Sequence, residues 1–150
     1  MVVVDASPII YYSRIGELYW LLGFYRSLKT TGTIVRETVD DARELNKPGV
    51  SAIEMALSKG WISVSELSDD EKYSARNIAR SEGIEPEDAE LIVLAIREND
   101  IVITNNKIMR HCLKMHHNRI LLTRCWQNFG SCRACMQAYL GDGFLGGVNK

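Results

Sequence analysis

The chain opens with Met1-Val2-Val3-Val4-Asp5-Ala6-Ser7, and this stretch decides the fold. Three consecutive β-branched valines predict a strand that is buried on both faces, as strands of parallel sheets are. Asp5 follows directly, so its charge lies at the carboxyl end of the strand, where open α/β sheets bind ligands. Ser7 and Pro8 then predict a helix, with Ser7 as the N-cap and Pro8 at the first helical position. We therefore expect Asp5 in a turn between a strand and a helix.

The composition is that of one globular domain. The chain has 150 residues, of which 46% are hydrophobic and 25% charged, and this is enough for a single domain over residues 1–150. The formal net charge of −1 gives no overall attraction to polyanions, so any nucleic-acid contact requires a local basic patch. No apolar run approaches the roughly 20 residues that span a bilayer. We expect a cytoplasmic protein without a membrane segment.

Strand and helix patterns alternate along the rest of the chain. Helices are expected over residues 8–15, 17–25, 36–46, 50–59, 68–82, 85–97, 107–117 and 125–140. Further strands are expected over residues 33–35, 61–64, 101–104 and 119–123, with a turn over 30–32 and a glycine-rich tail over 141–150. The aromatic-rich segment 17–25, including Trp20, fits core packing better than base stacking. The alternation predicts an α/β fold whose parallel strands end at one edge.

Polar side chains are expected to gather at that edge. Some end strands and others open neighbouring helices, and the set comprises Asp5, Glu37, Asp88, Glu90, Asn105 and Asn106. Oxygen ligands of this kind suit a hard cation such as Mg²⁺ or Mn²⁺, which activates water and offsets phosphate charge in phosphoryl transfer. The sequence therefore points to nuclease or phosphatase chemistry.

Each acid also has an ordinary interpretation. Glu37 and Asp88 lie near helix starts, where a carboxylate complements the helix dipole. Other acids are expected to form a solvated surface, and they are Asp40, Asp41, Glu44, Asp69 and Asp70. The combination of Asp5 with acids at matching positions, rather than any single acid, favours the cation site.

Four segments in this order resemble the PIN domain, and most of all its VapC-like branch of toxin nucleases. They are VVVDASPII (2–10), IVRETV (34–39), EDAELIVLA (87–95) and IVITNNK (101–107). Each is short, but the ordered set covers about residues 1–125. The resemblance implies an α/β/α sandwich around a mainly parallel sheet of about five strands, with residues 130–150 as an atypical C-terminal helix and tail. It also implies a Mg²⁺- or Mn²⁺-dependent ribonuclease.

The resemblance assigns roles to single residues. The positions that match the acids holding the metal are Asp5, Glu37 and Asp88. Glu90 matches a second acid of one branch, but two residues along a helix from Asp88 it points elsewhere, so Glu90 is the second choice as a ligand. Ser7 and Thr104 match small hydroxyl residues that support the site.

One position departs from the family pattern. Asn106 stands where the family usually has an acid, and an amide offers a neutral oxygen in place of a full charge. Three carboxylates argue against two tightly held ions and leave room for one. Either the enzyme is slow and uses a single metal, with Asn106 orienting a water or ligating directly, or the domain binds RNA or a protein partner without cleavage.

The expected chemistry is hydrolysis of an RNA phosphodiester. Lys107 and Arg110 begin the next helix and suit phosphate contacts, although surface charge explains them equally well. The VapC likeness also implies a homodimer and a small antitoxin protein as partner. A phosphatase on a similar sheet has less support, because the chain has no Gly-rich phosphate loop and no nucleophile motif.

All four cysteines lie in the last third of the chain, at Cys112, Cys125, Cys132 and Cys135. Together with the nearby histidines they allow a structural zinc site, but the Cys-x-x-Cys pair falls in a segment expected to be helical rather than in a turn. Disulfides are rare in a reducing compartment. Plain packing of free thiols is the favoured interpretation.

Overall fold

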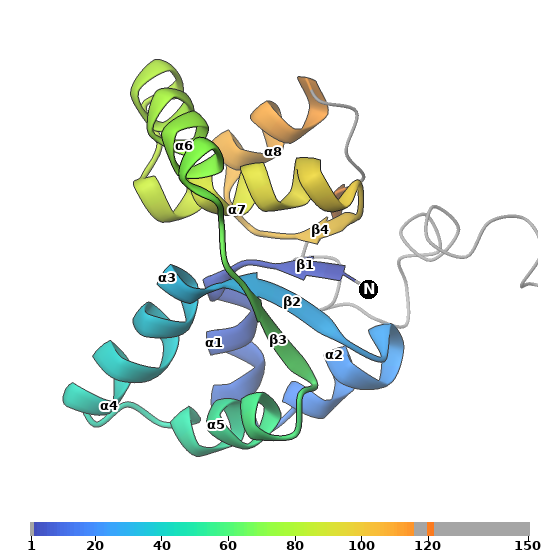
Figure 1. The fold of residues 1–150 in the computed structure, drawn as a ribbon. Helices are drawn as coiled ribbons and strands as arrows, with labels where there is room; N and C mark the ends of the chain where they lie inside the picture. The colour runs from blue at the N-terminus through green and yellow to red at the C-terminus, as the bar shows by residue number, and fades with distance from the viewer. Residues whose placement is uncertain (1, 116–119, 122–150) are drawn as a thin grey trace, which may run out of the picture.

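The computed structural model describes residues 2–115, 120 and 121, and its centre is a five-stranded parallel sheet (Figure 1). The strands are β1 (Val2–Val4), β2 (Leu28–Thr31), β3 (Ile62–Ser65), β4 (Ile101–Ile103) and β5 (Ile120–Leu121). Their spatial order is β3-β2-β1-β4-β5, and every neighbouring pair is parallel. The predicted α/β class and strand number are confirmed.

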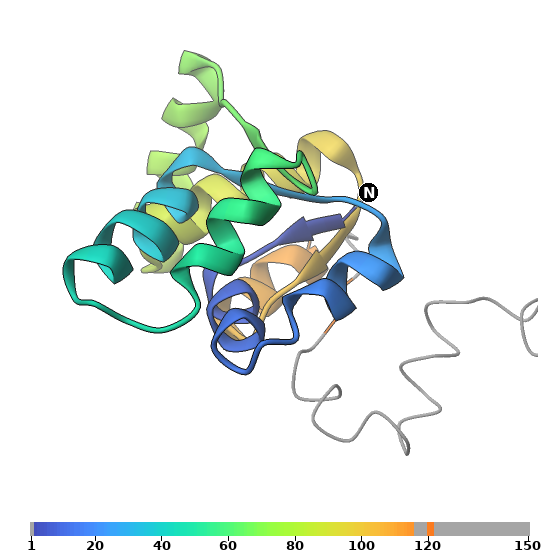
Figure 2. The ribbon, with the colours of Figure 1, turned by 90° about the horizontal axis from the view of Figure 1, so that it is seen from below.

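Helices cover both faces of the sheet. They are α1 (Ala6–Arg14), α2 (Leu18–Tyr25), α3 (Gly32–Val35), the π-helical segment η1 (Arg36–Asp41), α4 (Ala42–Glu44), α5 (Val50–Ser58), α6 (Asp69–Glu82), α7 (Pro86–Glu98) and α8 (Lys107–Met115). In Figure 1, α1, α2 and α5 lie below the sheet, and α6, α7 and α8 lie above it. Figure 2 views the molecule from the side of α1, α2 and α5. The layers form an α/β/α sandwich.

The order of the strands places a topological switch at β1. The chain first moves outward from β1 through β2 to β3, then returns across α6 and α7 to β4 on the other side of β1. Connections that leave β1 and β4 therefore run to opposite faces of the sheet. Ligands of open α/β folds bind in the crevice that this reversal opens beyond the carboxyl ends of the strands.

The core lies on both sides of β1 and around α7. Val3 and Val4 are fully buried, and α7 buries an unbroken run from Leu91 to Ala95, as its apolar pattern predicts. Trp20 was expected in the core but is 46% exposed, because it lies on the outer face of α2. In the part of the chain that the structure describes, no helix is long and apolar enough to cross a membrane.

The start of α1 differs from the prediction. Asp5, not Ser7, is the N-cap: its backbone is extended (φ −81°, ψ 164°), and its Oδ1 accepts a hydrogen bond of 2.6 Å from the Ala6 backbone amide. Ser7 and Pro8 are the second and third residues of the helix. A carboxylate placed directly after the strand caps the helix at once, so the turn is shorter than the Ser-Pro signal indicates.

The second strand also differs from the prediction. Residues 33–35 were expected as a strand after a turn at 30–32, but β2 occupies Leu28–Thr31 and residues 32–35 form α3. The Thr31 hydroxyl accepts a hydrogen bond of 3.4 Å from the backbone amide of Ile34 and so caps α3. That cap outweighs the β preference of Ile34 and Val35, because both side chains pack into or against the core from a helix as well as they would from a strand.

The C-terminal predictions are tested only in part. Within the described residues, α8 ends at Met115 and β5 comprises Ile120 and Leu121, inside the expected strand over 119–123. The expected helix over 125–140 and the tail to residue 150 lie outside the described residues. A single domain over 1–150 stays a prediction.

Candidate active site

Asp5 occupies the turn between β1 and α1 and is almost completely buried, with 4% of its surface exposed. Its Oδ1 accepts from the Ala6 amide, and its Oδ2 accepts a hydrogen bond of 2.7 Å from the hydroxyl of Thr104, which follows β4. Burial raises the pKa of Asp5, whereas these two hydrogen bonds lower it. Donors from two elements thus hold both carboxylate oxygens in place.

Asn106 links the end of β4 to two other elements. Its backbone amide donates to the Thr104 hydroxyl at 3.0 Å, and its side-chain Nδ2 donates to Asp88 Oδ2 at 2.6 Å. Its Oδ1 accepts from the backbone amides of Ile108 (2.9 Å) and Met109 (3.2 Å) at the start of α8. Asn106 is therefore a helix cap and a donor to an acid, and its oxygen is engaged by these two amides.

Asp88 lies in the first turn of α7, which begins with Pro86 after the N-cap residue Glu85. Partial burial is the main cause that raises its pKa to about 6, and the charges of Asp5, Glu87, Glu37 and Glu85 add to the effect. A carboxyl group surrounded by four other acids is a site that attracts positive charge.

Glu37 reaches the same region from η1. The segment is wound as a π-helix, a local widening that is frequent at functional sites. The pKa of Glu37 is raised by burial first and then by the charges of Glu87, Asp5 and Asp41. The electrostatic coupling shows that Glu37 and Asp5 lie close enough to influence each other although 32 positions separate them in the sequence.

These elements enclose one acidic cleft of about 370 Å³. It is lined by Asp5, Ala6, Ser7, Glu37, Glu85, Glu87, Asp88, Asn105 and Asn106. It lies beyond the carboxyl ends of β1 and β4, at the topological switch. Glu85 and Glu87 line the cleft although the sequence pattern does not single them out as site residues.

A comparison with known protein families shows to which family the chain belongs. The family model DUF3368, described as a PIN domain, matches residues 1–121. The chain belongs to the PIN domain family. No curated protein sequence matches it. PIN domains are generally nucleases, so the acidic cleft at the switch point is the candidate active site of a nuclease fold.

Four predicted residues of this PIN domain do not line the cleft, and they are Glu90, Thr104, Lys107 and Arg110. Glu90 Oε2 accepts a hydrogen bond from the Thr33 hydroxyl on α3, so its carboxylate joins α7 to α3. Lys107 is exposed at the start of α8, and Arg110 is half-buried one turn later. Ser7 does line the cleft, whereas Thr104 acts from behind through Asp5.

The donor set of the PIN domain fits a divalent cation through shared charge. Over residues 2–115 and 120–121, no three or more histidine, cysteine or acidic side chains form a group that could hold a metal ion as they stand. Mg²⁺ does not need one, because it keeps several waters and is often held by one or two carboxylates together with substrate phosphates. Asp5 and Glu37 both raise the pKa of Asp88, so a cation among them would relieve their repulsion.

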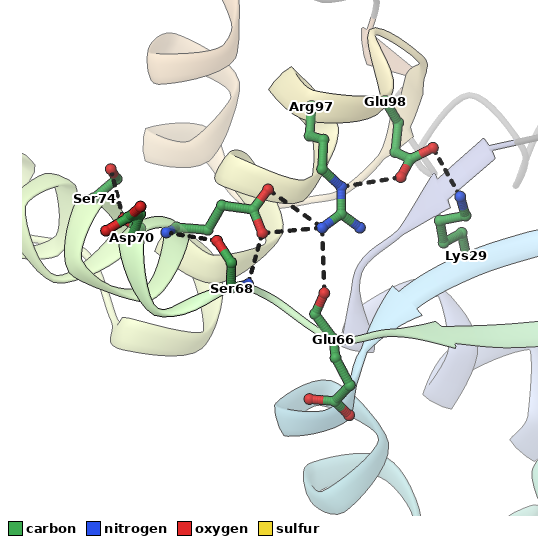
Figure 3. A network of polar contacts seen from close by, with 8 residues as sticks. Lys29, Glu66, Ser68, Asp70, Ser74, Arg97 and Glu98 are labelled. Atoms are coloured by element: carbon green, nitrogen blue, oxygen red, sulfur yellow. Dashed lines mark hydrogen bonds and ion pairs between the residues drawn. The ribbon is translucent and has the colours of Figure 1, made fainter.

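A polar network fixes the other end of α7, and Figure 3 shows it from close by. Arg97 forms an ion pair of 3.0 Å with Glu71 at the start of α6 and donates to the Glu66 carbonyl at 3.2 Å. Glu98 pairs with Lys29 of β2 at 2.7 Å. The helix that carries Asp88 is thus tied to α6 and to the sheet.

The cysteine predictions are reached only at Cys112. Its thiol is buried on the inner face of α8, it is free, and burial raises its pKa. A buried thiol of this kind packs as a small apolar group. The other three cysteines lie outside the described residues.

Proposed function

We propose that this PIN domain is a Mg²⁺- or Mn²⁺-dependent ribonuclease that hydrolyses RNA phosphodiesters. One observation carries the proposal: Asp5, Glu37 and Asp88 come from three elements far apart in the sequence, line one cleft, and are electrostatically coupled. Carboxylates that repel one another in a cleft need a counter-charge, and a divalent cation supplies it. The family resemblance of the motifs supports RNA as the substrate.

The chain's own groups preorganise the site. Asp5, Glu37 and Asp88 would hold the cation, which when bound activates water and offsets the charge of the reacting phosphate. Thr104 and the Ala6 amide fix the Asp5 carboxylate, and the Asn106 amide fixes Asp88. These donors prevent both carboxylates from turning away before substrate arrives, which lowers the cost of reaching the reactive geometry.

A second candidate function is binding of RNA or a protein partner without cleavage. Asn106 favours it, because an amide adds no negative charge and its oxygen already caps α8. With three carboxylates from the family's acidic set, a single cation would be held weakly. The two functions differ in one measurable property, which is metal-dependent cleavage.

The decisive variant is Asp5→Asn, which keeps the size of the side chain and removes its charge. Wild-type protein should cleave single-stranded RNA with Mn²⁺ and not with EDTA, and Asp5→Asn should lose at least about a hundredfold in rate, since it removes the most buried acid of the site. Asp70→Asn is the matched control, because Asp70 is exposed on α6. Equal cleavage by all three proteins would refute the proposal, and RNA binding without any cleavage would establish the second candidate.

The likeness to VapC-like toxins extends the proposal to the cell. We infer a toxin that acts as a homodimer in the cytoplasm and is blocked by a small antitoxin protein. The same Asp5→Asn pair provides the test, because induced wild-type protein should arrest the growth of its expression host and the variant should not. Equal growth, from a protein active on RNA in vitro, would remove the toxin role and leave the ribonuclease.

A further inference from the structure

A second hollow adjoins the acidic cleft. This one has a volume of about 190 Å³ and is lined by Thr33, Arg36, Glu37, Asp41 and Glu87. Glu37 and Glu87 line both spaces, so they form a common wall. We call these two adjoining hollows the groove; its lining extends from Asp5 and Asp88 to Arg36 and Asp41 of η1.

Arg36 is the cation of this groove. Of the described residues that line the two hollows, it alone carries a positive charge. Its side chain is exposed, and no carboxylate of the described residues lies within 4.0 Å of its guanidinium, although acids share its surroundings. By contrast, Arg43 is paired to Glu54 and Arg97 to Glu71. The guanidinium of Arg36 is therefore available to a ligand.

The π-helical winding of η1 explains how Arg36 comes to face the groove. Arg36 and Glu37 are consecutive, yet both line the second hollow together with Asp41, five positions after Arg36. A π-helix bonds each residue to the fifth one along, so its wider turn groups such positions on one wall. The backbone of η1 thus places Arg36 and Asp41 on the same wall of the second hollow.

We propose that Arg36 binds a phosphate next to the reacting one, so that the groove along η1 is the path of the RNA strand. A polyanion that enters a cleft with five acids needs positive charge beside the reacting position, and a guanidinium matches phosphate oxygens with two parallel hydrogen bonds. The assignment rests on the proposed ribonuclease function and narrows its substrate: the enzyme takes chains with at least two phosphates, and a dinucleoside monophosphate makes no use of Arg36.

The test compares Arg36→Ala and Arg36→Lys with Arg76→Ala. Arg76 is exposed on α6 and lines neither hollow, which makes it the matched control. Arg36→Ala should raise KM for a ten-nucleotide oligouridylate about tenfold, the effect of one charge-assisted contact, and leave kcat nearly unchanged. Arg36→Lys should recover part of the loss, and Arg76→Ala should match the wild type. Unchanged thermal unfolding of Arg36→Ala would confirm that the variant folds.

Salt dependence separates a phosphate contact from other roles. Binding is measured in the Asp5→Asn variant with Mn²⁺, so that the RNA stays uncut. The slope of the logarithm of the RNA association constant against the logarithm of salt concentration should become about 0.7 smaller in magnitude when Arg36 is replaced by Ala, which is the value for one phosphate of a single strand. An unchanged slope would overturn the assignment of Arg36, and so would an equal rise in KM of Arg36→Ala for the dinucleoside monophosphate uridylyl-uridine. If cleavage still depended on Asp5, the proposed ribonuclease function would remain supported. Absence of both RNA binding and cleavage in the wild type would overturn both.

Discussion

Replacing Thr104 by valine should uncouple Asp5 from the end of β4. The two side chains have nearly the same shape, and Thr104 is fully buried, so the change removes a hydroxyl without opening a cavity. The hydroxyl donates to the Asp5 carboxylate at 2.7 Å and accepts from the Asn106 amide at 3.0 Å. A hydrogen bond to a charged group contributes about 1.5–3 kcal/mol, and the abandoned amide adds about 1 kcal/mol. We expect a loss of about 2.5–4 kcal/mol in the free energy of unfolding.

Thr30→Val is the matched control for this prediction. Thr30 is also fully buried, lies in β2 beside β1, and donates to a neutral acceptor, the Val4 carbonyl, at 2.9 Å. Its loss should cost only about 0.5–1.5 kcal/mol. Urea unfolding at pH 7 in EDTA gives both values, and Mn²⁺-dependent RNA cleavage should fall in Thr104→Val but not in Thr30→Val. Equal destabilisation together with equal cleavage would refute the role of Thr104 as the holder of Asp5.

Two further predictions concern the charge of the cleft. Asn106→Asp keeps a cap for α8 but replaces the donor at 2.6 Å from Asp88 with a second carboxylate, and the repulsion costs about 1–4 kcal/mol at the screening typical of a protein surface. The metal-free variant should therefore have a lower Tm than the wild type, and Mn²⁺ should raise the Tm of the variant by more than that of the wild type. Equal Mn²⁺-induced shifts in Tm would contradict this prediction. The metal-free wild type should also lose stability as the pH rises from about 4 to 7, because the pKa of Asp88 is about 6 when folded and near 3.8 when unfolded, so the folded state binds more protons in this window. Urea midpoints of the wild type minus those of Asp88→Asn isolate this contribution, and a difference that grows more favourable with pH would contradict it.

The parts of the fold that the sequence predicts well are those where several local signals agree. Val2–Val4, Asp5 and the apolar body of α7 each combine a strong hydrophobic pattern with a clear boundary. β2 escaped prediction because its polar residues are satisfied by distant partners. Thr30 donates to the Val4 carbonyl, and Lys29 pairs with Glu98, 69 positions away. A strand whose polar groups are paired across the fold looks like a turn when only its own residues are visible.

The cleft residues divide in the same way. Asp5 and Asp88 are predictable because they sit where an element begins or ends, and element ends set the edge of a sheet. Arg36 and Glu87 lie inside helical segments and had no such signal. A helix pattern also does not show that a π-helical turn will bring Arg36 and Asp41, five positions apart, onto one wall. Glu90 shows the converse, because its spacing fits a ligand while its side chain bonds Thr33 instead.

Asn106 shows why one residue type leads to two functions. From its sequence position, Asn106 was expected either to orient a water or ligate the metal, or to mark a domain that binds without cleavage. The first expectation requires that its side-chain oxygen is free. The structure gives that oxygen to the start of α8 and gives the amide hydrogens to Asp88. The Asn106 amide therefore partly replaces a cation, because it directs the positive end of an N–H dipole at the Asp88 carboxylate, whose pKa the neighbouring acids raise. A site stabilised in this way in its metal-free form gains less from binding an ion than a site with four carboxylates. Weak metal affinity is then the expected consequence of Asn106, and it is compatible with catalysis at millimolar metal concentrations.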